Sequence, residues 1–236
     1  MSINVYWAPL CDPTPSSANC PLNYPAPERV LPELNQISVH VETGVMQCPS
    51  FTETLKNTYA VKCPFDIKME YQNSNDWNVE SGLGPDIVMG RSLSARTASI
   101  LASYIFVCEQ PLQMEVRQAT YHLNDFTNNT VLYGAKLDIG RYFRGTECAF
   151  HVRNNCNNLT VNYNDTLYYI TFETREPVRL VKFEATEEIM KYSQYTLKAR
   201  NATNGKRRKL EHYYNMYVKS LYHKKIIKLV KQNILD

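Results

Sequence analysis

Six short apolar and aromatic runs recur along the second half of the chain, about ten residues apart, as the strands of an all-β domain do. Residues that favour turns, such as Gly145, Asn154, Asn164 and Pro177, separate them. Short strands at this spacing are typical of an antiparallel sandwich or barrel. We therefore predict that residues 1–183 form a mainly β domain, an antiparallel β-sandwich of jelly-roll type. The runs are 131–133, 137–139, 148–152, 159–163, 167–172 and 178–183.

Earlier segments fit the same fold. Residues 65–71 place Phe65, Ile67, Met69 and Tyr71 on one face and charged residues on the other, which predicts a strand with one face in water. Residues 100–108 are apolar on both faces, which predicts a central strand. We also predict strands at 3–7, 37–41, 59–63 and 111–122, and a loop at 73–85.

Prolines are concentrated near the start of the chain. Seven of them lie between Pro9 and Pro32. A prolyl ring has no N–H to donate to a sheet and cannot continue a helix, so we predict an extended arm laid over the surface of the domain. Apolar residues such as Leu22, Tyr24 and Val30 indicate that the arm is docked.

The chain changes character near residue 184. Glu187 and Glu188 stand where acidic side chains suit the start of a helix. We predict a second segment, 184–236, with helices at 184–196 and 208–234 and a polar, basic break at 201–209. Apolar residues follow helical spacing in the second helix: Leu210, Tyr214, Tyr217, Leu221, Ile226, Val230 and Ile234.

Charge is unevenly distributed. Residues 198–236 contain 11 Lys and Arg and two acids, Glu211 and Asp236, for a net charge of +9. The remaining residues contain 15 basic and 21 acidic side chains, a net of −6, and the two values sum to the +3 of the whole chain. Such a basic segment either meets an acidic partner or folds back on the acidic body.

Two further features concern the compartment. The first residues lack the pattern of a signal peptide, and no apolar run reaches the roughly 18 residues that a membrane span needs. We therefore expect an intracellular protein without a transmembrane segment. The seven cysteines are expected to be mostly buried free thiols, which behave as small apolar residues.

Several motifs together resemble a known family. The chain is similar to a family of proteins encoded by tailed marine phages, cyanophages among them, that has no assigned activity. The resemblance implies a viral origin, a β-rich fold and a place in the virion or in the cytoplasm of the infected host cell, and it transfers no site. The motifs are Val5–Pro9, Cys48-Pro-Ser, Lys56–Tyr59, Asp138–Arg144, Cys148–Val152, Leu167–Thr174 and Val178–Phe183.

Two groups of residues are candidates for binding. Arg141 and Arg144 flank two aromatic residues, and guanidinium groups pair with carboxylates or phosphates. The basic C-terminal segment interleaves cations with tyrosines, a pattern that serves nucleic acid, a membrane surface, a protein partner or a solvated helix face. Its candidates are Lys206, Arg207, Arg208, Lys209, Tyr213, Tyr217, Lys224 and Lys225.

Two metal motifs are weaker. Cys148, His151 and Cys156 are spaced like zinc ligands, but a strand would point Cys148 and His151 to opposite faces. His40 and Glu42, with His122 or His151, could form an iron triad in an oxygenase-like jelly roll. We favour neither, and we predict no metal or cofactor. The sequence favours a non-enzymatic binding or structural protein with a protein partner; nucleic-acid binding through the C-terminal helix is the alternative.

Overall fold

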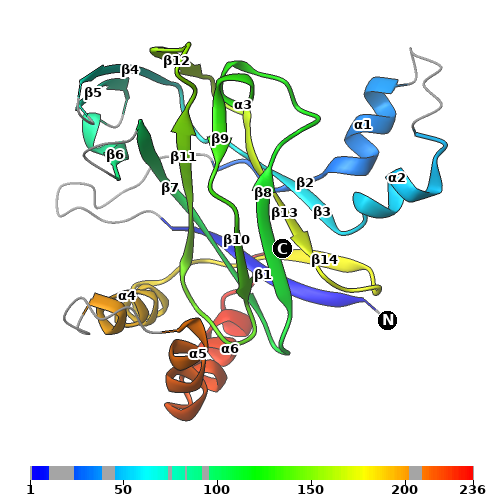
Figure 1. Ribbon diagram of the computed structural model, residues 1–236. Helices are drawn as coiled ribbons and strands as arrows, with labels where there is room; N and C mark the ends of the chain where they lie inside the picture. Colours follow the sequence, from blue (N-terminus) through cyan, green and yellow to red (C-terminus); the bar gives the residue numbers. More distant parts are fainter. Residues whose placement is uncertain are drawn as a thin grey trace.

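The computed structural model describes residues 2–10, 24–38, 46–73, 76–82, 84–91, 96–201 and 209–235. The fold is mainly β, with 43% strand and 26% helix, and its three sheets are largely antiparallel (Figure 1). The predicted β-rich body with helices at the C-terminal end is therefore confirmed.

Sheet A is the largest sheet. Its one parallel pair among the described strands joins β1 to β14, and the other pairs are antiparallel. The predicted central strand is confirmed, because β7 pairs with both β1 and β11 and is buried along most of its length. In order, sheet A contains β14 (Val178–Lys182), β1 (Ile3–Leu10), β7 (Thr97–Cys108), β11 (Gly145–Val152) and β9 (Thr130–Leu132), and β6 (Val88–Gly90) also pairs with β7.

Two further sheets complete the β body. Sheet B contains β10 (Ala135–Asp138), β8 (Gln113–Gln118), β13 (Thr166–Phe172), β3 (Thr58–Lys62) and β2 (Glu28–Arg29) in that order. Sheet C contains β12 (Asn158–Val161), β4 (Ile67–Asn73) and β5 (Asp76–Ser81). Two short helices, η1 (Pro85–Ile87) and α3 (Asp125–Asn129), lie in connections between strands.

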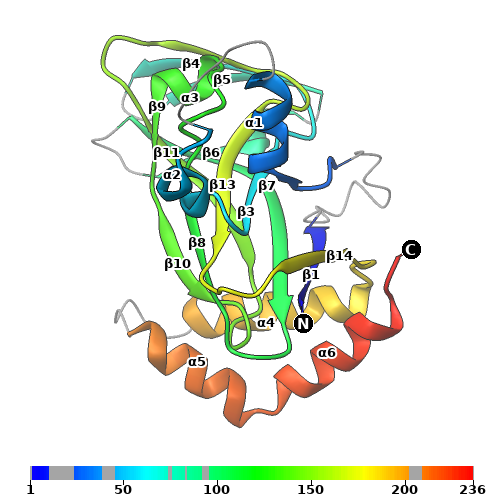
Figure 2. The same ribbon diagram turned by 90° about the vertical axis from the view of Figure 1, so that its right-hand side faces the viewer.

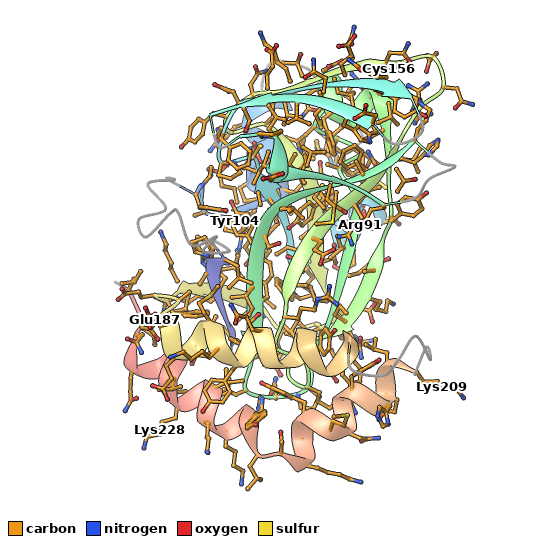
Figure 3. The ribbon with its side chains drawn as sticks, turned by 90° about the vertical axis from the view of Figure 1, so that its left-hand side faces the viewer. Arg91, Tyr104, Cys156, Glu187, Lys209 and Lys228 are labelled. Atoms are coloured by element: carbon orange, nitrogen blue, oxygen red, sulfur yellow. The ribbon has the colours of Figure 1, made fainter. Side chains whose placement is uncertain are left out.

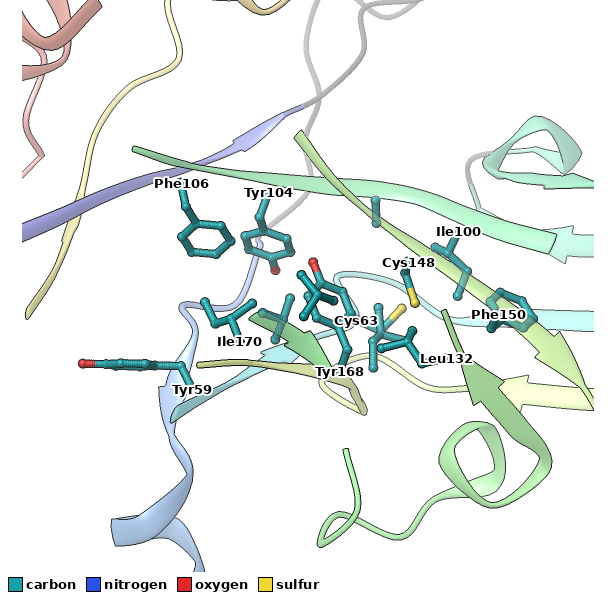
Figure 4. Close-up of a cluster of buried hydrophobic side chains, with 14 of the residues drawn as sticks. Tyr59, Cys63, Ile100, Tyr104, Phe106, Leu132, Cys148, Phe150, Tyr168 and Ile170 are labelled. Carbon is teal, nitrogen blue, oxygen red and sulfur yellow. The ribbon is translucent and has the colours of Figure 1, made fainter. Parts of the chain in front are cut away.

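The main core contains side chains from all three sheets. Tyr104 and Phe150 of sheet A and Tyr168 of sheet B are completely buried in it (Figure 4). The Tyr104 hydroxyl donates to the carbonyl oxygens of Pro25 and Lys62, 3.1 and 3.2 Å away, so even this polar group has partners.

The cysteines agree in part with expectation. Cys63, Cys108 and Cys148 are buried free thiols, as predicted. Burial raises the pKa of Cys63 to about 12. Cys48 is exposed and Cys156 is partly exposed, while Cys11 and Cys20 lie outside the described residues.

The C-terminal helices lie at one end of the β body, where they pack on the outer face of β1 and β7 in sheet A (Figure 2). They are α4 (Glu187–Asn201), α5 (Leu210–Lys219) and α6 (Tyr222–Gln232). Alternation along β1 points Val5 and Trp7 into the main core and Tyr6 and Ala8 towards the helices. The predicted boundary at residue 184 lies between β14 and α4, yet the helices share this second cluster with β1 and β7. From the helices it receives Ile189, Tyr217, Ile226 and Val230.

The predicted helix over 208–234 is instead two helices. The break is at Leu221, which has a left-handed backbone with φ of 59°. Neither glycine nor proline stands there, so the sequence carries no ordinary signal for the break. Of the apolar residues predicted to pack, Tyr214, Tyr217, Ile226 and Val230 are buried, whereas Leu210, Leu221 and Ile234 are exposed.

Three other predictions are wrong in part. The loop predicted at 73–85 contains β5, an edge strand that alternates between exposed and half-buried positions. A strand was predicted at 37–41, but Ile37 and Ser38 are the last two residues of helix α1 (Val30–Ser38). Residues 39–41 lie outside the described part.

The extended arm also ends earlier than predicted, because Pro32 stands in the first turn of α1, where a missing N–H breaks no helical bond. The arm's residues 11–23 lie outside the described part. Val30 and Leu34 pack α1 against sheet B, together with α2 (Pro49–Thr54), which was not predicted.

Candidate binding groove

A groove opens where two strands separate. β9 pairs with β11 of sheet A, and the chain then passes through Tyr133 and Gly134 into β10, which pairs with β8 of sheet B. A Cβ at Gly134 would lie 3.0 Å from the Val116 carbonyl oxygen, so a residue without a side chain suits this crossing. Beyond this crossing β10 and β11 belong to different sheets, and the space between them is the groove.

The groove has a volume of about 340 Å³. This volume lies at the lower end of the range of small ligand sites. Helix α5 closes one end with Leu210 and Tyr213. Apolar and aromatic side chains line most of it, and one pair of opposite charges stands in its wall. The remaining lining residues are Val116, Tyr133, Ala135, Leu137, Tyr142, Arg144, Gly145, Thr146, Glu147 and Ala149.

Two arginines share the carboxylate of the groove. Arg144 Nη2 donates to Glu147 Oε1 at 2.7 Å, and Arg91 donates to the other oxygen of the same carboxylate. Burial alone would raise the pKa of Glu147, but the two guanidinium groups lower it below its ordinary value. The triad therefore carries a net charge of +1, and guanidinium N–H groups remain that Glu147 does not use.

Backbone groups of both strands point towards the groove. Tyr133 N–H donates to the Ala149 carbonyl. The pairing of β11 with β7 is irregular at Glu147, but burial alternates without a break along β11, so the N–H and C=O of Glu147 project to the same side as those of Ala149, away from β7. On β10, Asp138 N–H donates to the Tyr214 hydroxyl of α5, and the same alternation turns the backbone of Lys136 away from β8. Among the described strands, neither Lys136 nor Glu147 has a pairing partner on that side.

The motif Asp138–Arg144 builds this end of the groove. Asp138 Oδ1 accepts hydrogen bonds from the backbone N–H of Leu112 and Gly140, and Oδ2 accepts one from Arg141 Nε at 2.6 Å. A Cβ at Gly140 would lie only 2.1 Å from the Gln110 carbonyl oxygen, which explains the glycine in the motif.

Arg141 and Arg144 have different roles. Arg141 lies over the Tyr214 ring at 4.9 Å and within 3.4 Å of Glu211, so it ties β10 to α5. Arg144 faces the groove instead. Of the two arginines predicted for binding, only Arg144 is placed in the groove, beside the predicted Tyr213.

The other predicted residues lie on the C-terminal helices. Lys209, Lys224 and Lys225 are exposed, and Tyr217 is buried, so its ring is not accessible to a ligand. Lys206, Arg207 and Arg208 lie outside the described residues.

Acid should weaken the Glu147 triad. A carboxylate whose pKa is lowered on folding adds stability above its unfolded pKa, near 4.5, and this contribution is lost as the pH falls through the folded pKa below 4.5. We expect Glu147→Gln to lower the free energy of unfolding by about 1 kcal/mol at pH 7, a value that allows for its partial exposure. The difference from the parent protein should shrink as the pH falls below about 4.5 and vanish once the folded carboxyl is also protonated. Denaturant unfolding at several pH values measures this.

The matched control is Glu80→Gln, which changes an exposed carboxylate on β5. A difference that is constant with pH in Glu147→Gln, or equal in Glu80→Gln, would contradict the assignment.

A polar cluster that the sequence did not reveal anchors α1. Glu33 lies 2.8 Å from Lys62 Nζ and 3.0 Å from His122 Nε2, and His122 Nδ1 lies 2.5 Å from the Tyr169 hydroxyl. Tyr169 is completely buried, so this carboxylate–histidine–hydroxyl chain is a support for α1 and not an accessible reaction site. Its members come from four distant segments, and no local spacing in the sequence connects them.

The described residues do not bring together the ligands of either predicted metal motif. His40 and Glu42 lie outside the described residues, and His122 is held by Glu33 and Tyr169. Within the described ranges, no three His, Cys, Asp or Glu side chains converge as a metal site would require. Cys148 is buried, while His151 belongs to the opposite, half-buried face of β11.

No helix in the described part of the chain is both long enough and apolar enough to cross a bilayer. In comparisons with known proteins, no protein-family model, no curated protein and no solved structure matches the chain.

Proposed function

We propose that the protein acts by binding, and that it holds an extended segment of a partner protein in the groove between β10 and β11. The observation that carries this proposal is the meeting of two unpaired strand edges with an aromatic and apolar lining. An extended peptide offers the N–H and C=O groups that such edges lack, and its alternate side chains enter the groove.

The groove also indicates which peptide it would accept. Leu137, Ala149 and Leu210 favour an apolar side chain. Tyr133 and Tyr213 offer rigid aromatic walls, which contribute strongly to interfaces. The net positive triad of Arg91, Glu147 and Arg144 favours an acidic side chain beside it.

Two finer points belong to the same proposal. Sheets A and B would form a sandwich, supported by their shared core; the parallel pair of β1 and β14 and the separate sheet C depart from an all-antiparallel jelly roll. The resemblance to phage proteins supports a viral origin, in which the partner would be another virion component or a host protein.

Selection from a random linear peptide library tests the function. We expect the full chain to select peptides with an apolar and an acidic residue close together. Ala149→Trp should weaken their binding at least tenfold, because the indole fills the groove. Isothermal titration calorimetry with a selected peptide measures the affinity.

Val131→Trp is the matched control, since Val131 is exposed on the neighbouring strand and does not line the groove. The proposal fails if no peptide is selected, or if both tryptophan variants bind the peptide equally while keeping the parent's circular dichroism spectrum.

A further inference from the structure

The outer surface of α5 and α6 is a lysine face, which we define as Lys219, Lys224, Lys225 and Lys228. All four side chains are exposed. In α6, Ile226 and Val230 are buried against the sheet, and helical geometry places Lys224 and Lys228 on the side opposite to them. Lys228 projects from the outer side of the helical layer (Figure 3).

Little negative charge on the same two helices balances this face. α6 contains no acidic residue, and the one acid of α5, Glu211, lies against Arg141. Lys231 pairs with Glu109 of the β body at 2.8 Å, but the four lysines of the lysine face have no carboxylate of a described residue within 4.0 Å. Lys231 thus links α6 to the β body by an ion pair, whereas the other three lysines of α6 are exposed to solvent.

Most tyrosines and apolar side chains of α5 and α6 are packed inside the protein, which limits the kind of partner that the lysine face can bind. Tyr214 and Tyr217 are buried, and Tyr222 packs edge-on against Tyr192 at 5.3 Å, so these rings do not form a platform for unpaired bases. The apolar stripes of α5 and α6 face sheet A, whereas a helix that binds a membrane surface turns its apolar face to the lipid. The exposed apolar side chains between the buried faces of α5 and α6 are Met216, Val218 and Leu221, which form no continuous stripe along either helix.

We propose that the lysine face binds the phosphate backbone of duplex nucleic acid, without preference for sequence. Its lysines are held on packed helices, and the closely spaced phosphates of a duplex match such a surface in charge. The proposal is independent of the peptide groove, because none of the four lysines lines it.

The test is the salt dependence of duplex binding by the full chain. Neutralisation of about four phosphates predicts a log–log slope of roughly −3.6 for a DNA duplex, measured by fluorescence anisotropy between low and physiological salt. Replacing all four lysines with glutamine should bring the slope close to zero and leave the melting temperature nearly unchanged, since exposed side chains contribute little to stability.

A second variant carries the same loss of charge elsewhere. Lys68, Arg153, Arg175 and Arg179 are exposed on the β body, and their replacement with glutamine should preserve the slope. Equal weakening in both variants would show that net charge alone attracts the duplex, which would overturn the proposal.

Two other results would also overturn it. One is binding that survives in the lysine-face variant but is lost when Lys206, Arg207 and Arg208 become glutamine. The other is lysine-dependent binding to phosphatidylserine vesicles with no duplex binding, which would assign the face to a membrane surface.

Discussion

Replacing Ile226 with alanine is expected to lower the free energy of unfolding by about 2–5 kcal/mol. Ile226 is completely buried between α6 and the outer face of sheet A, in a cluster with Tyr6, Ile105 and Val107. Truncation removes apolar contacts and leaves a cavity that a rigid sheet cannot close. Denaturant unfolding measures the loss.

Lys225→Ala is the matched control on the same turn of the same helix. Its side chain is exposed, so the change should remain within about 0.5 kcal/mol. If the two variants are equally stable, α6 does not pack on the sheet as described, and the orientation of the lysine face is wrong with it.

Asp138→Ala is expected to cost about 2–6 kcal/mol, because it leaves two buried backbone N–H groups without their acceptor, at about 1–3 kcal/mol each. The Asp138 side chain is only 2% exposed and accepts hydrogen bonds from Leu112, Gly140 and Arg141. The same change should loosen α5, because Asp138 holds Arg141, whose guanidinium lies over the Tyr214 ring of that helix. Thermal unfolding and denaturant titration both measure the effect.

Two control variants separate the loss of the Asp138 carboxylate from a general effect of removing an acid and from the loss of the Arg141 ion pair. Asp76→Ala, at an exposed position on β5, should be nearly neutral. Arg141→Ala should cost less than Asp138→Ala, because Asp138 keeps its two backbone donors. A loss of less than 1 kcal/mol in Asp138→Ala would contradict the role of this carboxylate as the anchor of the 138–144 motif.

Alternation and helical spacing predicted much of the fold. The apolar run at 100–108 became β7 because both of its faces are covered, one by sheet B and the other by the helices. The spacing of Tyr214, Tyr217, Ile226 and Val230 likewise identified the packed faces of α5 and α6. These signals are local and arise from burial, which is why sequence alone could show them.

Other features depend on tertiary contacts and left no local pattern. β5 pairs with β4 at the edge of sheet C, where a half-exposed strand needs few apolar residues. The left-handed backbone at Leu221 is unusual for a leucine, and no turn residue marks it.

In the candidate site, too, local sequence patterns predicted some features and tertiary contacts determine the others. The spacing of Arg141 and Arg144 marked the correct segment, but only the fold distinguishes the arginine that clasps α5 from the one that faces the groove. The groove itself forms because the chain passes from sheet A at β9 to sheet B at β10, and pairing with distant strands determines this crossing.

Amide hydrogen exchange on the complex with a selected peptide tests the groove most directly. If the peptide adds as a strand, the exchange of the Lys136 or the Glu147 amide should slow at least tenfold, because an unpaired strand edge gains a hydrogen-bond partner. Amide exchange in β5 should not change, because this strand lies at the edge of sheet C, which does not form the groove. Peptide binding that leaves both the Lys136 and Glu147 amides unprotected would contradict the groove between β10 and β11 as the binding site.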